Sequence, residues 1–210
     1  MRPFLLVLSS PSGGGKSTIA RRLLTQRSDV GYSVSATTRA PRAGEQDGVH
    51  YHFLASEEFT RRVEAGEFVE WAAYGSSRYG TLRSEVDTVL ASGRHVMLDI
   101  EVDGARQVRR QYPDSVHVFL LPPSAEVLMH RLHGRQTEDR AALLRRMAIA
   151  DSEMASVAAY DYVVVNDDLD HAVNQVSAII EAESHRTSRL SHLNATVAQL
   201  REDLAVRSKQ

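Results

Sequence analysis

Residues 4–18 read FLLVLSSPSGGGKST, and this stretch decides which fold we expect for the rest of the chain. The apolar run at 4–8 is typical of a buried strand, three glycines follow it, and a helical pattern begins at Lys16. A glycine-rich loop between a strand and a helix is typical of a phosphate-binding loop, or P-loop. Its main-chain N–H groups and the positive end of the helix dipole both face the bound anion.

The residues of this loop have separate expected tasks on a polyphosphate. Lys16 is expected to reach the β- and γ-phosphates, and Ser17 is expected to hold Mg²⁺. Ser10 stands where the first glycine of the pattern G-x-x-x-x-G-K-[ST] is expected. The alternative is a glycine-rich turn that binds no ligand. Such a turn would give no reason for a Lys-Ser pair directly after three glycines.

Composition restricts the class of protein. The 210 residues are 42% hydrophobic and 25% charged, as in an ordinary globular protein of one domain with or without an appendage. A net charge of −2 gives no overall attraction to nucleic acid or to an anionic membrane, so we expect neither as a partner. The absence of cysteine excludes disulfides and favours a cytoplasmic location. No stretch approaches the roughly 20 apolar residues that span a bilayer.

Strand and helix patterns alternate along the chain. This alternation predicts an α/β fold in which helices cover both faces of a P-loop NTPase-type parallel sheet. We expect strands at 4–9, 32–35, 49–53, 68–74, 95–100, 116–121 and 162–165. We expect helices at 16–27, 56–65, 82–91, 103–111, 124–133, 138–156 and 169–183, with a loop at 36–48 and a turn at 76–81.

A second anion site is indicated by the loop after the second strand. Arg39 and Arg42 lie three residues apart, and the hydroxyls of Tyr51 and Tyr79 lie further along. Guanidinium groups bind phosphate oxygens in pairs and keep their charge at neutral pH. The alternative is two solvated loop arginines.

With these stretches in view, the chain resembles guanylate kinases, which phosphorylate GMP with ATP. The resemblance covers about residues 4–182 and rests on SPSGGGKST, SVSATTRAPRAGE, the Gly48…Tyr51 pair, EFVEW, RYGT, LDI, RLHGR and VVVNDD, in that order. It implies a GMP-binding set of Ser35, Arg39, Arg42, Tyr51, Glu70, Tyr79, Thr81, Asp99 and Glu101. It implies an ATP-binding set of Ser12, Gly13, Gly14, Gly15, Lys16, Ser17, Thr18 and Asn166, with Asn166 at the adenine.

The chemistry of guanine agrees with part of that assignment. The carboxylate of Glu70 can accept hydrogen bonds from guanine N1–H and N2–H, while the hydroxyls of Ser35 and Thr81 can donate to O6. Adenine lacks the N1–H, and a site built for a missing hydrogen bond can discriminate by roughly 10⁴–10⁵. The alternative for Glu70 is an ordinary acid on a half-exposed strand.

The resemblance also implies the catalytic set, which is Lys16, Arg39, Asp99, Arg131, Arg135 and Arg146. Asp99 would hold Mg²⁺ through water, and the arginines would offset the repulsion between phosphates. The chain departs from the family pattern at Glu101 and Asp103, where Asp and Gln are usual, and at Gln136, where the lid usually has glycine. The histidine pairs His50/His52 and His130/His133 lack a third ligand at convincing spacing, so we expect no metal site there.

These inferences divide the chain into parts. We expect a kinase core at 1–32 and 93–183, with a lid at about 134–150, a GMP-binding insertion at 33–92 and a tail at 184–210. In the tail, apolar residues recur at the 3-4 spacing of a coiled-coil seam, at Leu190, Leu193, Val197, Leu200 and Leu204. We expect a helical tail that takes part in self-association as a homodimer. The alternatives are packing on the chain's own core, or disorder.

Two other functions compete with GMP phosphorylation. A guanylate-kinase-like module that only binds protein would use the same surface without catalysis, but Lys16, Ser17 and the lid arginines are present. A related kinase for another phosphorylated acceptor would not need the guanine-reading residues. Use of dGMP is also expected.

Overall fold

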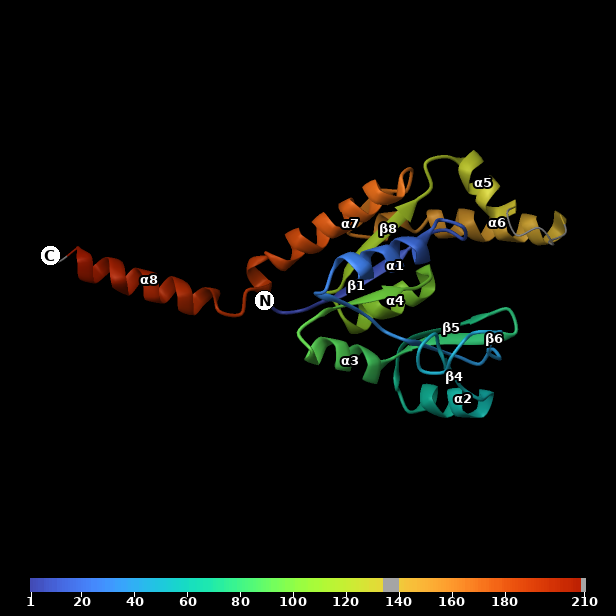
Figure 1. Ribbon diagram of the computed structural model, residues 1–210, viewed down its shortest axis with the longest axis horizontal. Coiled ribbons are helices and arrows are strands. Elements are labelled where there is room, and N and C mark those ends of the chain that lie inside the picture. Colours follow the sequence, from blue (N-terminus) through green and yellow to red (C-terminus); the bar gives the residue numbers. More distant parts are fainter. Residues whose placement is uncertain (134–139, 209–210) are drawn as a thin grey trace.

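The computed structural model describes residues 1–133 and 140–208, and its centre is a parallel sheet (Figure 1). The sheet has five strands in the order β2-β7-β1-β8-β9. They are β1 Leu5–Ser9, β2 Val30–Tyr32, β7 His95–Asp99, β8 Val116–Leu121 and β9 Tyr162–Val165. The expected α/β class is confirmed.

Helices cover both faces of this sheet because successive strand residues point to opposite sides. Leu6 and Leu8 of β1 pack into one cluster with α1 (Lys16–Gln26) and α7 (Leu169–Ser184). Leu5 and Val7 pack into the other cluster with α3 (Arg83–Ala91) and α4 (Val102–Gln111). The helices α5 (Ala125–His133) and α6 (Arg140–Met154) share a small apolar cluster of their own.

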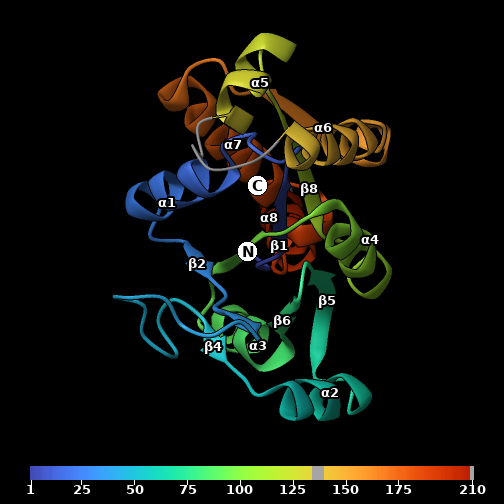
Figure 2. The same cartoon turned by 90° about the vertical axis from the view of Figure 1, so that its right-hand side faces the viewer.

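A second, mixed sheet lies on the side of α3 and α4 (Figure 2). Its order is β4-β3-β6-β5, and its strands are β3 Ser35–Thr37, β4 His52–Phe53, β5 Phe68–Tyr74 and β6 Ser77–Leu82. The helix α2 (Ser56–Glu64) buries Phe59 against this sheet, where its ring stacks on Phe68 with centroids 4.5 Å apart. The second sheet therefore has a separate apolar cluster from the central sheet.

Three expected elements differ from the structure. The single strand expected at 32–35 is wrong, because the chain leaves the central sheet after β2 and begins the second sheet at β3. The strand expected at 49–53 is wrong before its last two residues, because residues 48–50 form a turn that starts at Gly48, whose φ is 71°. The turn expected at 76–81 is the strand β6, which pairs with β5 across a tight connection at Gly75, with φ 61°.

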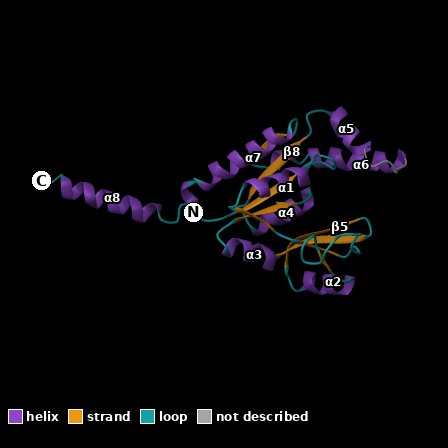
Figure 3. Ribbon diagram, viewed as in Figure 1, coloured by secondary structure: helices purple, strands orange, loops and turns teal. Residues whose placement is uncertain are grey.

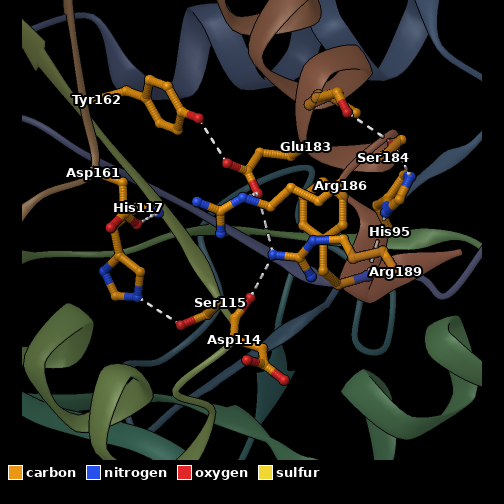
Figure 4. A network of polar contacts seen from close by, with 12 residues as sticks. His95, Asp114, Ser115, His117, Asp161, Tyr162, Glu183, Ser184, Arg186 and Arg189 are labelled. Carbon is orange, nitrogen blue, oxygen red and sulfur yellow. Dashed lines mark hydrogen bonds and ion pairs between the residues drawn. The ribbon is translucent and has the colours of Figure 1, made fainter.

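The tail begins attached to the core and then leaves it. Arg189 is buried, and its guanidinium donates to Glu183 Oε2 at 3.2 Å and to the carbonyl of Asp114 at 2.8 Å (Figure 4). After a short 3-10 turn at Thr187–Arg189, α8 (Leu193–Arg207) extends away from the body as a separate helix (Figure 3). Leu190 and Leu193 are half-buried, whereas Val197, Leu200 and Leu204 are 45%, 57% and 66% exposed. The apolar residues of α8 from Val197 onward are thus not covered by the chain's own core.

Candidate active site

The loop between β1 and α1 has the backbone that its glycines permit. Gly13 and Gly15 have φ of 83° and 90°, a left-handed conformation that side chains disfavour. Gly14 has a different reason, because a Cβ there would lie 2.6 Å from Cβ of Ser10. Ser10, the departure from the usual pattern, is buried beneath the loop, and its hydroxyl donates to the carbonyl of Pro11 at 3.1 Å.

Lys16 begins α1 and lies between two carboxylates. Its Nζ is 3.0 Å from Oε1 of Glu101 and 3.4 Å from Oδ1 of Asp99. Leu8 pairs with Asp99 in the parallel register of β1 and β7, which brings the acid to the same edge of the sheet as the loop. Burial lowers the pKa of Lys16, but the two carboxylates outweigh it and the pKa is raised. Lys16 is therefore a firmly charged ammonium.

Glu153 contacts the P-loop, although the sequence carried no signal for it. It lies on α6, and its Oε2 accepts a hydrogen bond of 3.0 Å from the main-chain N–H of Ser12. Burial and the neighbouring carboxyl of Glu101 raise the pKa of Glu153 to about 7. A carboxylate thus occupies one of the N–H groups that a P-loop offers to phosphate.

The residues expected to read guanine lie in one row across the second sheet. Ser35 of β3 pairs with Thr81 of β6, and Thr81 pairs with Glu70 of β5. Residues paired across antiparallel strands share a face of the sheet. The hydroxyl of Thr81 donates to Oε1 of Glu70 at 2.6 Å, and both side chains are buried. Burial raises the pKa of Glu70, whereas Thr81 and the charge of Lys16 act in the opposite direction.

The residues expected to form a second anion site gather around Arg39. Its guanidinium makes two hydrogen bonds of 2.9 Å to the carboxylate of Glu45, which also accepts the N–H of Arg42 at 2.7 Å. The hydrogen bond from Arg39 holds the pKa of Glu45 at about 2. The rings of Tyr51 and Tyr79 are 6.0 Å apart, and the Arg39 guanidinium lies 5.5 Å from the Tyr51 ring centre. The structure thus brings Arg39 and both tyrosines together, while the side chain of Arg42 is exposed.

Arg131 and Asn166 both contact the Gly14 carbonyl of the P-loop. Nη2 of Arg131 donates to the carbonyl of Asn166 at 3.2 Å, and Nδ2 of Asn166 donates to the carbonyl of Gly14 at 2.8 Å. A Cβ on Gly15 would lie 2.4 Å from that same Nδ2, so glycine is required for the contact. Nη1 of Arg146 donates to the carbonyl of Leu132 at 2.9 Å. Arg135 and Gln136 lie outside the described residues.

The departure at Asp103 has a local explanation. Asp103 lies in the first turn of α4, where a negative charge is favourable to the helix dipole, and it pairs with Arg106 at 2.9 Å. Its side chain is 77% exposed. Asp103 therefore stabilises the start of α4 from its outer side.

This chain is similar to known proteins over nearly its whole length. The family model described as guanylate kinase matches residues 2–183. The chain belongs to the guanylate kinase family. It is accordingly a nucleoside-monophosphate kinase, and the resemblance inferred from the motifs is confirmed.

Individual guanylate kinases show how far the likeness extends. That of Symbiobacterium thermophilum is 51% identical over 185 residues, which cover 88% of each chain. That of Paramagnetospirillum magneticum is 48% identical over 201 residues, covering 95% of this chain and 94% of its own, so the similarity reaches into residues 184–210. The crystal structure of guanylate kinase from Anaplasma phagocytophilum has a TM-score of 0.73 at 34% identity and covers 92% of both chains.

Residues 1–133 and 140–208 contain no group of three His, Cys, Asp or Glu side chains placed to hold a metal ion. Among the helices of the same residues, none combines the length and apolar character needed to cross a bilayer.

Proposed function

We propose that this guanylate kinase family member transfers the γ-phosphoryl group of ATP to GMP, giving ADP and GDP. The observation that supports this most directly is the row of Ser35, Thr81 and Glu70, in which the Ser35 hydroxyl can donate to guanine and the Glu70 carboxylate, held by the Thr81 hydroxyl, can accept from it. Because that edge is the same in dGMP, we propose that dGMP is also an acceptor.

We propose that the donor side is the P-loop. The loop residues from Ser12 to Thr18 would surround the ATP phosphates, with the Ser12 N–H released from Glu153. Lys16 would exchange its contacts with Glu101 and Asp99 for the β- and γ-phosphates. Asn166 would contact the adenine. Its present bond to the Gly14 carbonyl leaves one N–H and the amide oxygen for a base.

Mg²⁺ would be held by Ser17 and, through water, by Asp99. Ser17 is exposed in the first turn of α1, and the Asp99 carboxylate lies 3.4 Å from Lys16 at the end of β7. Such oxygen donors are the ligands that Mg²⁺ prefers. Bound there, the ion would neutralise charge on the β- and γ-phosphates.

The acceptor phosphate would be bound by Arg39, Arg42, Tyr51 and Tyr79, with Asp99 and Glu101 completing the GMP site. Arg39 already carries a bidentate carboxylate, so a phosphate would approach its remaining N–H groups or displace Glu45.

The transfer itself needs no nucleophilic side chain, because an oxygen of the GMP phosphate attacks the γ-phosphorus in line. Two phosphate charges about 4 Å apart repel by roughly 4 kcal/mol at an effective dielectric constant of 20. Arg131, Arg135 and Arg146 would offset that repulsion and stabilise the charge that develops on the transferring oxygens.

The division into parts is proposed on the same basis. The core would comprise 1–32 and 93–183, with a lid at about 134–150, and the insertion at 33–92 would bind GMP. We also propose a cytoplasmic enzyme without nucleic-acid or membrane partners, in keeping with a net charge of −2 and the absence of cysteine. A homodimer through residues 184–210 is proposed because Val197, Leu200 and Leu204 of α8 are apolar and exposed.

A coupled assay of ADP formation separates this function from its rivals. With ATP present, we expect rapid turnover with GMP and dGMP, and little with AMP, UMP or no acceptor. A protein-binding module would show no turnover with any acceptor. A kinase that is specific for another acceptor would show no turnover with GMP.

A further inference from the structure

The strand that carries Glu70 is held by a helix of the core. β5 is the last strand of the second sheet, so within residues 1–133 and 140–208 no strand pairs with one side of its backbone. Gln107 of α4 occupies that side, since its Nε2 donates to the Trp71 carbonyl at 2.8 Å and its Oε1 accepts the Trp71 N–H at 3.2 Å. Gln111, one turn later, donates to the Val69 carbonyl at 2.6 Å. The two amides replace the hydrogen bonds of a missing strand on both sides of Glu70.

The same face of α4 leaves room for the Glu70 carboxylate. Gly104 precedes Gln107 by three residues, and residues three or four apart share a helix face. A Cβ on Gly104 would lie 2.6 Å from Oε2 and 3.2 Å from Cδ of Glu70. Glycine is among the least favourable residues inside a helix, so its presence in α4 requires a reason. Contact with the carboxylate supplies that reason.

This face also relates the base site to the phosphate site. α4 starts directly after Glu101, which contacts Lys16 at 3.0 Å, and Glu101 is joined through Ile100 to Asp99 at the end of β7. A helix is stiff over its ten residues, so its far turns place β5 relative to the P-loop. The position of Glu70 is thereby set by the core and not only by its own sheet.

We propose that Gln107 and Gln111 are positioning residues for guanine recognition, and that Gly104 is a specificity-determining residue because it admits the Glu70 carboxylate. The proposal rests on the proposed role of Glu70 in reading guanine. Hydrogen bonding to two adjacent N–H groups tolerates displacements of only about 0.5 Å. Loss of either amide would let β5 shift and would weaken GMP binding without altering the ATP site.

The test compares Gln107→Ala, Gln111→Ala and Gly104→Ala with Arg110→Ala, an exposed residue of the same helix. We expect each of the first three to raise the KM for GMP at least fivefold, to leave the KM for ATP within twofold, and to lower the preference for GMP over AMP. Arg110→Ala should change none of these. Thermal melting of each variant sets an assay temperature at which all are folded.

A double-mutant cycle separates positioning from simple structural support. Once Glu70→Gln has removed the carboxylate, adding Gln107→Ala should raise the KM for GMP by less than twofold. If Glu70→Gln weakens GMP binding, either of two results would overturn the proposal. In the first, the losses multiply in the double variant, so that Gln107→Ala still raises the KM for GMP fivefold. In the second, Gln107→Ala and Gln111→Ala leave the KM for GMP unchanged. If Glu70→Gln itself left GMP unaffected, the base-reading role on which the proposal rests would fail instead.

Discussion

Thr81 donates a hydrogen bond of 2.6 Å to Oε1 of Glu70, and the two residues are 1% and 6% exposed. The bond crosses from β6 to β5 and fixes one oxygen of the carboxylate. A carboxylate oxygen has two lone pairs, so Oε1 can still accept one hydrogen bond while Oε2 accepts others. Thr81 therefore orients the acceptor that we propose faces guanine.

Glu70→Gln is expected to weaken GMP binding at least tenfold. The substitution replaces one acceptor by an amide donor that faces the guanine N1–H and N2–H donors, and a lost hydrogen bond to a buried charged group costs about 1.5–3 kcal/mol. Calorimetric titration of both proteins with GMP and AMP measures the change. Thr81→Val keeps the shape but frees the carboxylate, and it should reduce affinity less. Unchanged GMP affinity in Glu70→Gln would remove Glu70 from base recognition.

Lys16→Ala is expected to abolish phosphoryl transfer while GMP binding stays close to that of the unaltered protein. Lys16 would supply the charge for the ATP phosphates, and its removal leaves the carboxylates of Glu101 and Asp99 without their cation. Steady-state turnover and GMP titration test this, with Arg201→Ala on α8 as the control. A variant that kept about a tenth or more of normal turnover would contradict the assignment of Lys16 to transfer.

The contribution of two buried histidines to stability is expected to fall as the pH drops from about 6.5 toward 4, whereas Glu153, whose pKa is raised to about 7, contributes in the opposite direction over this range. Burial, reinforced by Arg109, lowers the pKa of His117 from 6.5 to about 4, and burial also lowers the pKa of His95. Histidines with a lowered pKa contribute stability that is fully present above the unfolded value and is lost as the unfolded chain takes up protons. Denaturant unfolding from pH 4 to 8 measures the slope.

His117→Gln is the matched variant for this effect, since its amide can reach the position of Nε2, which lies 2.8 Å from Oγ of Ser115. It should remove the loss of stability that His117 contributes at acid pH and leave the contributions of His95, Glu153 and other groups. An unchanged pH slope in this variant would show that His117 is not kept neutral by the fold.

Deletion of residues 193–210 is expected to lower the molecular mass in solution and to leave GMP kinase activity intact. It removes α8 with its exposed Val197, Leu200 and Leu204, but keeps Arg189 in its buried contact with Glu183. Light scattering of the full-length and shortened proteins decides the matter. A full-length monomer at micromolar concentration would refute the homodimer.

A longer deletion serves as the contrast. Removal from residue 186 onward also takes away Arg189 and leaves the Glu183 carboxylate, which is 3% exposed, without this cation. Breaking a buried ion pair by removing one partner costs about 3–5 kcal/mol, so this protein should melt at a clearly lower temperature. Equal melting temperatures of the two deletions would contradict the anchoring role of Arg189.

Much of the architecture was predictable because it depends on neighbours in the chain. The P-loop occupies consecutive residues, and the left-handed φ of Gly13 and Gly15 is what a glycine run at that point permits. The α/β class follows from alternating strand and helix periods, and motif resemblance gave the family. The second sheet was predicted less well, because its strands are short and β6 carries the same small and polar residues as a turn.

Part of the candidate site could be recognised only from the tertiary structure. The sequence named Ser35, Glu70 and Thr81, but the pairing of β3, β6 and β5 is what sets them in one row. Glu153 carries no local signal, because its partner Ser12 is 141 residues away. The hydrogen bonds from Gln107 and Gln111 of α4 to β5 could not be predicted for the same reason. A local pattern records the conformation of neighbouring residues, whereas contacts between distant segments depend on how whole elements pack, and packing joins residues that no spacing relates.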